Sequence, residues 1–164
     1  MDKAKKRLLF ICLGNICRSP AAHGIMQHLV DERGLSADFH IDSAGIGGWH
    51  SGELPDRRMR EHASRRGFQL THRARQFASS SDFGNFDLIL TMDADNFRAI
   101  THLAQTSAER GKVRRMTDFL HKYAGETSVP DPYYGGPRDF EWALDLLEDA
   151  CRGLLDELLG KEQI

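Results

Sequence analysis

A cysteine and an arginine six positions apart, Cys12 and Arg18, are the residues of this sequence best suited to act on a phosphate-like anion. A thiolate is a nucleophile, and a guanidinium presents a planar fork that matches two phosphate oxygens. If residues 12–18 curl over a helix N-terminus, backbone N–H groups and the helix dipole hold an oxyanion there and favour the thiolate of Cys12. The alternative for this spacing is a buried cysteine at a strand end and an arginine on the surface.

The segments on either side of this loop predict a strand before it and a helix after it. Residues 7–12 form a short apolar run bounded by turn signals, which is typical of a buried strand. Ser19 and Pro20 provide a hydroxyl N-cap and a proline at the first helical position, so we expect a helix over residues 19–33, ended by Gly34. The loop is therefore expected where the carboxyl end of a strand meets a helix N-terminus.

The rest of the chain alternates between strand and helix patterns. The expected strands are residues 39–43, 86–92 and 113–117, and the expected helices are residues 55–66, 93–103 and 140–159. This alternation implies right-handed crossovers and a parallel sheet covered on both faces, with ligands bound at the carboxyl ends of the strands. The length of 164 residues, without internal repeat or linker, predicts a single domain over residues 1–164.

Charge and cysteine content narrow the function classes. The 22 Lys and Arg residues nearly balance the 24 Asp and Glu residues, and a net charge of −2 offers no overall field for nucleic acid or an anionic membrane. The first apolar run is too short for a secretory signal, so we expect a cytoplasmic protein whose three cysteines are reactive thiols rather than disulfides. Common zinc motifs and the phosphate-loop lysine motif do not occur, so we expect neither a metal nor a nucleotide cofactor.

Residues 12–20, which read CLGNICRSP, closely resemble the signature of the low-molecular-weight protein tyrosine phosphatases. The resemblance covers nearly the whole chain. It continues through Asp42-Ser43-Ala44-Gly45, Trp49, Pro55-Asp56, His72, Met92-Asp93 and Asp131-Pro132-Tyr133-Tyr134. It implies a three-layer α/β domain of the flavodoxin-like type, with a four-stranded parallel sheet flanked by helices.

The resemblance also implies roles for the loop residues. Cys12 attacks phosphorus to form a cysteinyl-phosphate, and Ser19 assists the thiol as leaving group through a hydroxyl hydrogen bond. Asn15, plausible as a left-handed residue in a tight loop, is held by a network of Ser19, Ser43 and His72. For His72 alone, an exposed histidine beside a helix is the simpler interpretation. The phosphate-binding residues implied are Leu13, Gly14, Asn15, Ile16, Cys17, Arg18 and Ser19.

A proton donor is also needed, because breaking a P–O bond requires an acid near the leaving oxygen and a thiolate cannot supply the proton. The prolines at positions 130 and 132 stiffen a segment that carries one carboxyl group, Asp131. Such a segment is by itself most often only a turn. Matched to the family motif, Asp131 becomes the general acid and, in the second step, the base that activates water.

The pocket walls and the support of Arg18 follow from the same resemblance. Asp93 is expected to orient Arg18, although on its own it would be interpreted as a helix N-cap. A lone tryptophan such as Trp49 is likewise more often a packing residue. His23 departs from the acidic residue frequent in the family, and a protonated His23 would oppose the dipole of the first helix. The expected substrate pocket consists of Leu13, Ile16, Trp49, Tyr133 and Tyr134.

The function expected from these residues is metal-independent hydrolysis of protein phosphotyrosine by a monomer, with phosphate or vanadate as pocket ligands. Arsenate reductases of the thioredoxin-coupled kind share the fold but need two more cysteines in mid-chain, which this sequence lacks between Cys17 and Cys151. Protein-arginine phosphatases typically have threonine at the position of Ile16 and lack the second tyrosine of the acid motif. A non-catalytic phosphotyrosine reader would need neither nucleophile nor acid.

Redox control is a further expectation. Cys17 lies five residues from Cys12, and the family resemblance supports a protective disulfide between them after oxidation. The alternative is that Cys17 only packs beneath the loop.

Overall fold

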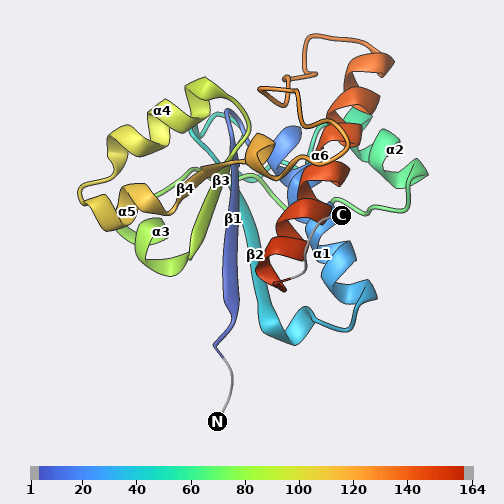
Figure 1. Cartoon of the computed structure of the whole chain (residues 1–164). Coiled ribbons are helices and arrows are strands. Elements are labelled where there is room, and N and C mark those ends of the chain that lie inside the picture. Colours follow the sequence, from blue (N-terminus) through green and yellow to red (C-terminus); the bar gives the residue numbers. More distant parts are fainter. Residues whose placement is uncertain (1–3, 161–164) are drawn as a thin grey trace.

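The computed structural model describes residues 4–160, which form three layers around one parallel sheet (Figure 1). The strands are β1 (Lys6–Cys12), β2 (Phe39–Gly45), β3 (Leu88–Thr91) and β4 (Val113–Arg115), in the spatial order β2-β1-β3-β4. All three strand pairings are parallel, and the register sets Cys12 opposite Gly45. The predicted four-stranded α/β fold is confirmed. No helix in residues 4–160 is long and apolar enough to cross a membrane.

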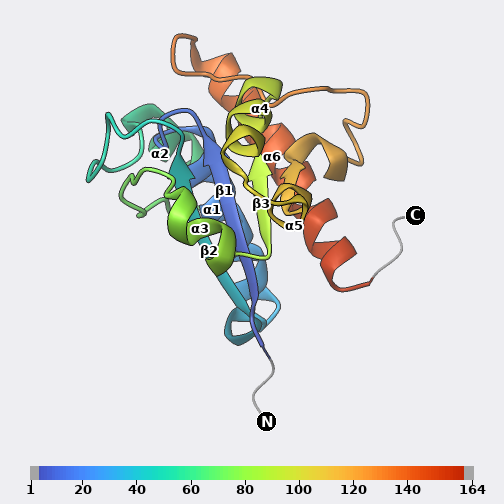
Figure 2. The ribbon, with the colours of Figure 1, turned by 90° about the vertical axis from the view of Figure 1, so that its left-hand side faces the viewer.

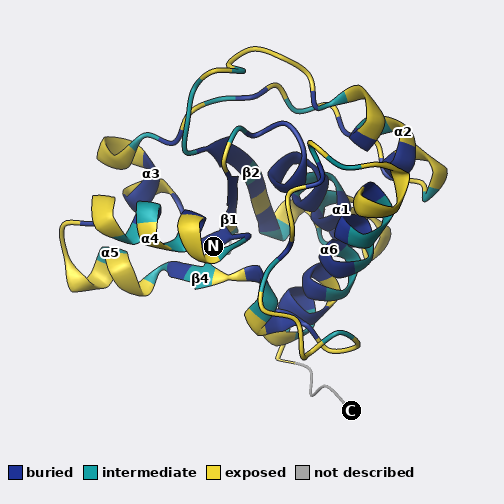
Figure 3. Ribbon diagram, turned by 90° about the horizontal axis from the view of Figure 1, so that it is seen from above, coloured by how far each residue is buried: buried dark blue, intermediate teal, exposed yellow. Residues whose placement is uncertain are grey.

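Helices cover both faces of the sheet (Figures 1 and 2). One layer contains α1 (Arg18–Glu32), α2 (Arg57–Arg65) and α6 (Pro137–Leu158), and the other contains α3 (Ser79–Asn85), α4 (Ala94–Leu103) and α5 (Ser107–Gly111). Two separate clusters of buried apolar side chains fill the spaces between the layers. The strands and the inward sides of α1 and α6 are correspondingly buried (Figure 3).

β1 is largely buried because it lies between β2 and β3 in the sheet. Leu8, Phe10 and Cys12 face one core cluster, and Leu9 and Ile11 face the other. This is why residues 8–12 form an unbroken apolar run instead of alternating with polar residues. Burial on both faces fixes the register of β1 and with it the position of Cys12 at the carboxyl end.

The predicted N-cap of the first helix is wrong. α1 begins at Arg18, and the N-cap position is occupied by Cys17, whose side chain makes no capping hydrogen bond. The hydroxyl of Ser19 instead contacts Cys12 and Asn15. Ser19 therefore supports the loop rather than capping the helix.

Other element boundaries differ by a few residues. The strand expected over residues 113–117 ends at Arg115 and continues as a 3-10 helix, Met116–Phe119. α6 begins at Pro137, earlier than expected, and Asp139 accepts a hydrogen bond from the Gly136 N–H before it. The short helices α3 and α5 were not predicted, because their polar sequences carry almost no apolar periodicity.

Candidate active site

The phosphate-binding loop, residues 12–18, leaves the carboxyl end of β1 and enters α1 directly. Its carbonyl groups are held from outside: the oxygens of Cys12, Leu13 and Ile16 accept hydrogen bonds from the N–H groups of residues 46, 47 and 56, at 3.0, 2.9 and 2.8 Å. A loop whose carbonyls face outward turns its N–H groups inward, toward the N-terminus of α1. This arrangement suits an oxyanion.

Close packing at the end of β2 requires a glycine. A Cβ atom on Gly45 would lie 2.9 Å from the carbonyl carbon of Gly14 and 3.0 Å from the backbone nitrogen of Asn15. Such contacts would displace the phosphate-binding loop. Gly45, part of the motif that resembled the family, therefore lets the loop rest against β2.

Asn15 organises the loop from its buried interior. Its φ of 58° places it in the left-handed region, where asparagine is better tolerated than most residues. Its Oδ1 accepts hydrogen bonds from the Arg75 backbone N–H at 3.0 Å and from His72 Nε2 at 3.2 Å. Its Nδ2 donates to Ser19 Oγ at 2.7 Å, which leaves the Ser19 proton free to donate to Cys12 Sγ, 3.0 Å away. The network therefore ends on the Cys12 sulfur.

Ser43 contacts this network through His72. Its Oγ lies 3.2 Å from His23 Nδ1, and its backbone carbonyl contacts the His72 ring. Burial, reinforced by the neighbouring His72, lowers the pKa of His23 to about 4, so this ring is neutral near pH 7. The charge expected to oppose the α1 dipole is therefore absent at neutral pH.

Arg18 is buried, with only 2% of its side chain exposed. Its Nη1 donates to Asp93 Oδ2 at 2.7 Å and to the Val129 carbonyl at 2.9 Å. Asp93 also accepts from the Asn96 N–H at 2.8 Å, so it both orients Arg18 and caps α4. Arg18 Nε is buried and has no hydrogen-bond partner among the described residues, which makes it a donor that a phosphate oxygen would satisfy.

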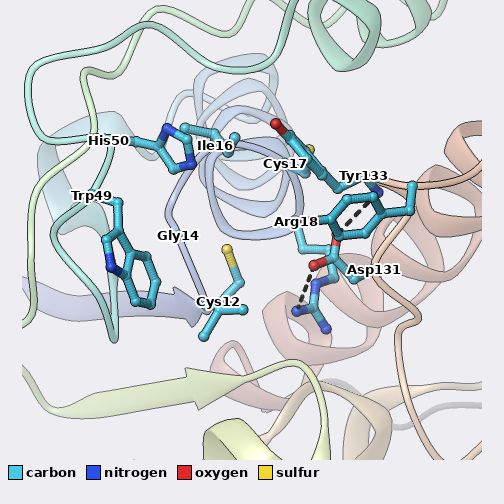
Figure 4. Close-up of a pocket in the computed structure, with 11 residues that line it drawn as sticks. Cys12, Gly14, Ile16, Cys17, Arg18, Trp49, His50, Asp131 and Tyr133 are labelled. Carbon is cyan, nitrogen blue, oxygen red and sulfur yellow. Dashed lines mark hydrogen bonds and ion pairs between the residues drawn. The ribbon is translucent and has the colours of Figure 1, made fainter.

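Asp131 lies on the opposite side of the pocket from Trp49 (Figure 4). Its Oδ2 is 3.6 Å from Arg18 Nη2, and its Oδ1 accepts from the Tyr133 N–H at 3.1 Å. The carboxyl side chain is 38% exposed, so water can reach it. Asp131, Arg18 and Cys12 therefore line one pocket although they come from distant parts of the chain.

The pocket has a volume of about 320 Å³, within the range of small-ligand sites. Trp49 and Tyr133 stand on its two sides above Cys12 (Figure 4). Trp49 is 71% exposed, and its ring lies against Gly47, where a side chain would collide with it. Tyr134 is 95% exposed and packs edge-on against Tyr133. All five residues expected to form the substrate pocket, Leu13, Ile16, Trp49, Tyr133 and Tyr134, line it.

Three contributors were not anticipated from the sequence. His50 lines the pocket beside the loop. Arg58 donates to the Tyr133 carbonyl at 2.8 Å and so ties α2 to the segment that carries Asp131. Arg75 holds Asn15 through its backbone and Asp42 through its side chain, at 3.0 Å in each case. These contacts join segments far apart in the sequence, and no local pattern signals them.

Cys17 is buried beside the pocket and is a free thiol. Burial, with the nearby carboxylate of Asp56, raises its pKa well above the ordinary value. Cys17 therefore stays protonated at neutral pH. The disulfide expected between Cys12 and Cys17 remains a prediction.

Comparisons with known proteins agree with this geometry. The family model described as low molecular weight phosphotyrosine protein phosphatase matches residues 7–164. A low molecular weight protein-tyrosine-phosphatase of Streptomyces coelicolor is 43% identical, over 91% of each chain. The crystal structure of a protein tyrosine phosphatase from Entamoeba histolytica, with Hepes in its active site, superimposes with a TM-score of 0.91 at 41% identity, covering 95% of this chain and 98% of that one.

A solved structure named for a different substrate is also similar. The Drosophila arginine phosphatase matches with a TM-score of 0.84 at 30% identity, covering 92% of this chain and 96% of that one. The likeness therefore extends to enzymes that differ in substrate. The matching family model spans nearly all of the sequence, and the chain belongs to the low molecular weight phosphotyrosine protein phosphatase family.

Proposed function

We propose that this protein hydrolyses phosphotyrosine in proteins through a phosphorylated Cys12, with Arg18 as the phosphate clamp and Asp131 as the acid. The observation that carries the proposal is the meeting of these three side chains around one pocket, with the Arg18 guanidinium fixed by Asp93 and Val129. Nucleophile, charge stabilisation and proton donor are thus all supplied by side chains.

In the first step the Cys12 thiolate attacks phosphorus, an S–P bond forms, and the P–O bond to the tyrosine oxygen breaks. The inward N–H groups and Arg18 hold the three remaining phosphate oxygens, on which negative charge is spread in the transition state. Asp131 gives its proton to the leaving phenolate oxygen.

In the second step water attacks the phosphorus of the cysteinyl-phosphate. Asp131, now a carboxylate, takes a proton from this water, and the S–P bond breaks to release inorganic phosphate. The Ser19 hydroxyl, 3.0 Å from the sulfur, donates to the departing thiolate. The Asn15 amide supports this step because it occupies the Ser19 oxygen and so directs the hydroxyl proton toward Cys12.

The walls of the pocket favour an aryl ester. A tyrosine ring fits between Trp49 and Tyr133 while its phosphate reaches the loop, whereas the short phosphoserine side chain would place its backbone against these walls. Ile16 in the pocket is apolar, which distinguishes it from the threonine typical of arginine phosphatases. Phosphotyrosine is therefore the substrate class that the pocket supports best.

The test is turnover by Cys12→Ser and by the unchanged protein in EDTA. We expect the variant to lose hydrolysis of p-nitrophenyl phosphate by several orders of magnitude yet to bind inorganic phosphate or vanadate, since Arg18 and the loop remain. Activity of the unchanged protein should survive EDTA. Substantial turnover by the serine variant, or higher kcat/KM on phosphoarginine than on phosphotyrosine peptides, would overturn the proposal.

We also infer that the protein acts in the cytoplasm as a monomer. Support comes from three free cysteines, with burial raising the pKa of Cys17 and Cys151, and from a near-neutral net charge. Sedimentation equilibrium at micromolar concentration tests the monomer, and a stable dimer would contradict it.

A further inference from the structure

Behind the phosphate-binding loop lies a cluster of three metal-binding side chains that do not touch the reacting atoms. His23 comes from α1, Asp42 from β2, and His72 from the segment between α2 and α3. One ring nitrogen of each histidine and one carboxylate oxygen lie within 4.8 Å of one another, and all three residues are half-buried. Within residues 4–160 this is the one group of three or more such side chains close enough to share an ion.

Hydrogen bonding shows that Nε2 of His72 carries a proton. A backbone N–H can only donate, so the Arg75 N–H identifies Asn15 Oδ1 as an acceptor. His72 Nε2, 3.2 Å from the same oxygen, must then be the donor. The other ring nitrogen, Nδ1, faces Asp42 Oδ1 at 3.6 Å. A ring nitrogen and a carboxylate oxygen that face each other at this distance can share a cation.

The two carboxylate oxygens of Asp42 have different neighbours. Asp42 keeps its other oxygen, Oδ2, for Arg75 at 3.0 Å, so Oδ1 is the atom that faces the histidines.

We propose that His23, Asp42 and His72 bind one Zn²⁺ ion behind the phosphate-binding loop. Two imidazole nitrogens and a carboxylate oxygen form a donor set typical of zinc. Ligand atoms about 2.0 Å from a tetrahedral zinc ion are about 3.3 Å apart. The His72–Asp42 separation of 3.6 Å is close to this value, and the widest separation in the cluster has to close by at most about 1.5 Å.

Space for a fourth ligand adjoins the cluster. His23 and His72 both line a cavity of about 270 Å³, together with the polar side chains of Gln27, Gln69 and Thr71. A water molecule there can complete the tetrahedron and find hydrogen-bond partners. Ser43 Oγ, 3.2 Å from His23 Nδ1, provides the outer contact that commonly orients a ligating histidine.

Zinc at this site would act on the loop through His72. Bound at Nδ1, the metal holds the proton on Nε2, which is the form that donates to Asn15. Asn15 in turn contacts Ser19, and Ser19 contacts Cys12. The ion would therefore stabilise the loop from behind while the phosphate pocket stays open.

Titration calorimetry with ZnCl2 in phosphate-free buffer tests the site. Full-length Cys12→Ser is the starting protein, because the Cys12 thiolate is a competing zinc ligand. We expect one Zn²⁺ per chain, and at least about tenfold weaker affinity after His23→Gln is added, since a protein ligand is lost. His28→Gln is the matched control: His28 lies on the same helix, is exposed and contacts Glu32, so its loss should leave the affinity unchanged.

A second pair of measurements covers the case in which His23→Gln fails to fold. Asp42→Asn should weaken zinc binding similarly, and Co²⁺ bound to Cys12→Ser should give the visible spectrum of a tetrahedral site without a sulfur-to-cobalt charge-transfer band. Failure of Cys12→Ser to bind zinc, or equal affinity in the His23 or Asp42 variants, would overturn the proposal. Neither outcome depends on phosphatase activity, because the starting variant lacks the nucleophile.

Discussion

The phosphate-binding loop and the acid segment face each other across one pocket but are held in very different ways. Cys12, Asn15 and Arg18 of the loop and Ser19 just after it are all buried. Hydrogen bonds join Ser19 to Cys12 and Asn15, and Arg18 is held by Asp93 and Val129. The acid segment, residues 120–136, has no helix or strand, and its Asp131 is 38% exposed. The proposed nucleophile and clamp are thus fixed before substrate arrives, whereas the proposed acid remains accessible to a leaving group and then to water.

Hydrogen bonds on either side of Asp131 limit how far this part of the acid segment can move. The Val129 N–H donates to the Met92 carbonyl at 2.8 Å, and the Val129 carbonyl accepts from Arg18. Arg58 holds the Tyr133 carbonyl from the other end. Asp131 therefore lies between two anchored positions on a segment that is otherwise exposed. The comparison predicts that changes in the acid segment alter catalysis alone, while changes in the loop alter both catalysis and stability.

The largest effect in the acid segment should come from Asp131→Asn. General acid catalysis contributes about 10²- to 10⁴-fold, so kcat/KM, which reports the step that expels the phenol, should fall by this factor for phenyl phosphate and much less for p-nitrophenyl phosphate, whose leaving group needs no proton. Steady-state kinetics over a series of aryl phosphates measures the difference. Equal losses for all leaving groups would remove Asp131 from the role of acid.

Arg18→Lys should cause the next largest loss of activity. An ammonium keeps the charge but cannot reproduce the planar fork or contact Asp93 and Val129 together, and we expect kcat/KM to fall about 10²- to 10³-fold. Inorganic phosphate should bind correspondingly less well as a competitive inhibitor. Unchanged phosphate affinity in this variant would show that Arg18 does not clamp the anion.

A stability measurement sharpens the contrast between the two regions. Asn15→Ala leaves the Arg75 N–H unpaired and forces alanine into a φ of 58°, so the free energy of unfolding should fall by roughly 2–4 kcal/mol. Asn15→Gly tolerates the backbone angle and should recover about 1 kcal/mol of this loss. Asp131→Asn should stay within about 0.5 kcal/mol of the unchanged protein. Chemical denaturation measures these free energies of unfolding. Equal losses of stability for Asn15→Ala and Asp131→Asn would refute the contrast between the loop and the acid segment.

A smaller effect should appear in the pH dependence of stability. His23 has a folded-state pKa of about 4 against 6.5 for the ordinary residue, so the unfolded chain binds more protons between these values. Stability should therefore fall as pH decreases from about 6.5 to 4, by up to about 3 kcal/mol from this group. Metal-free His23→Gln should lose less over the same range, although His72 contributes in both proteins. Parallel pH profiles would contradict a buried, neutral His23.

Much of this arrangement is predictable from local sequence. The apolar run of β1 and the helix that follows it identify where the loop lies, and the Cys12 to Arg18 spacing identifies its chemistry. Asp131 is recognisable only through the family motif, because an aspartate between prolines also forms ordinary turns. Arg58, Arg75 and the cluster of His23, Asp42 and His72 escape prediction because each depends on segments that only tertiary folding brings together. The predicted N-cap of α1 was wrong because the Ser19 hydroxyl contacts Cys12 and Asn15 instead of the helix backbone.

The covalent intermediate on Cys12 is the central claim, and rapid-quench mass spectrometry tests it most directly. Asp131→Asn mixed with p-nitrophenyl phosphate should form the intermediate readily but hydrolyse it slowly, because the variant lacks the base for the second step. We expect one phosphoryl group on the peptide that contains Cys12, appearing together with a burst of p-nitrophenol, and no label in Cys12→Ser. A phosphoryl group on another residue, or steady turnover without any labelled peptide, would contradict the account.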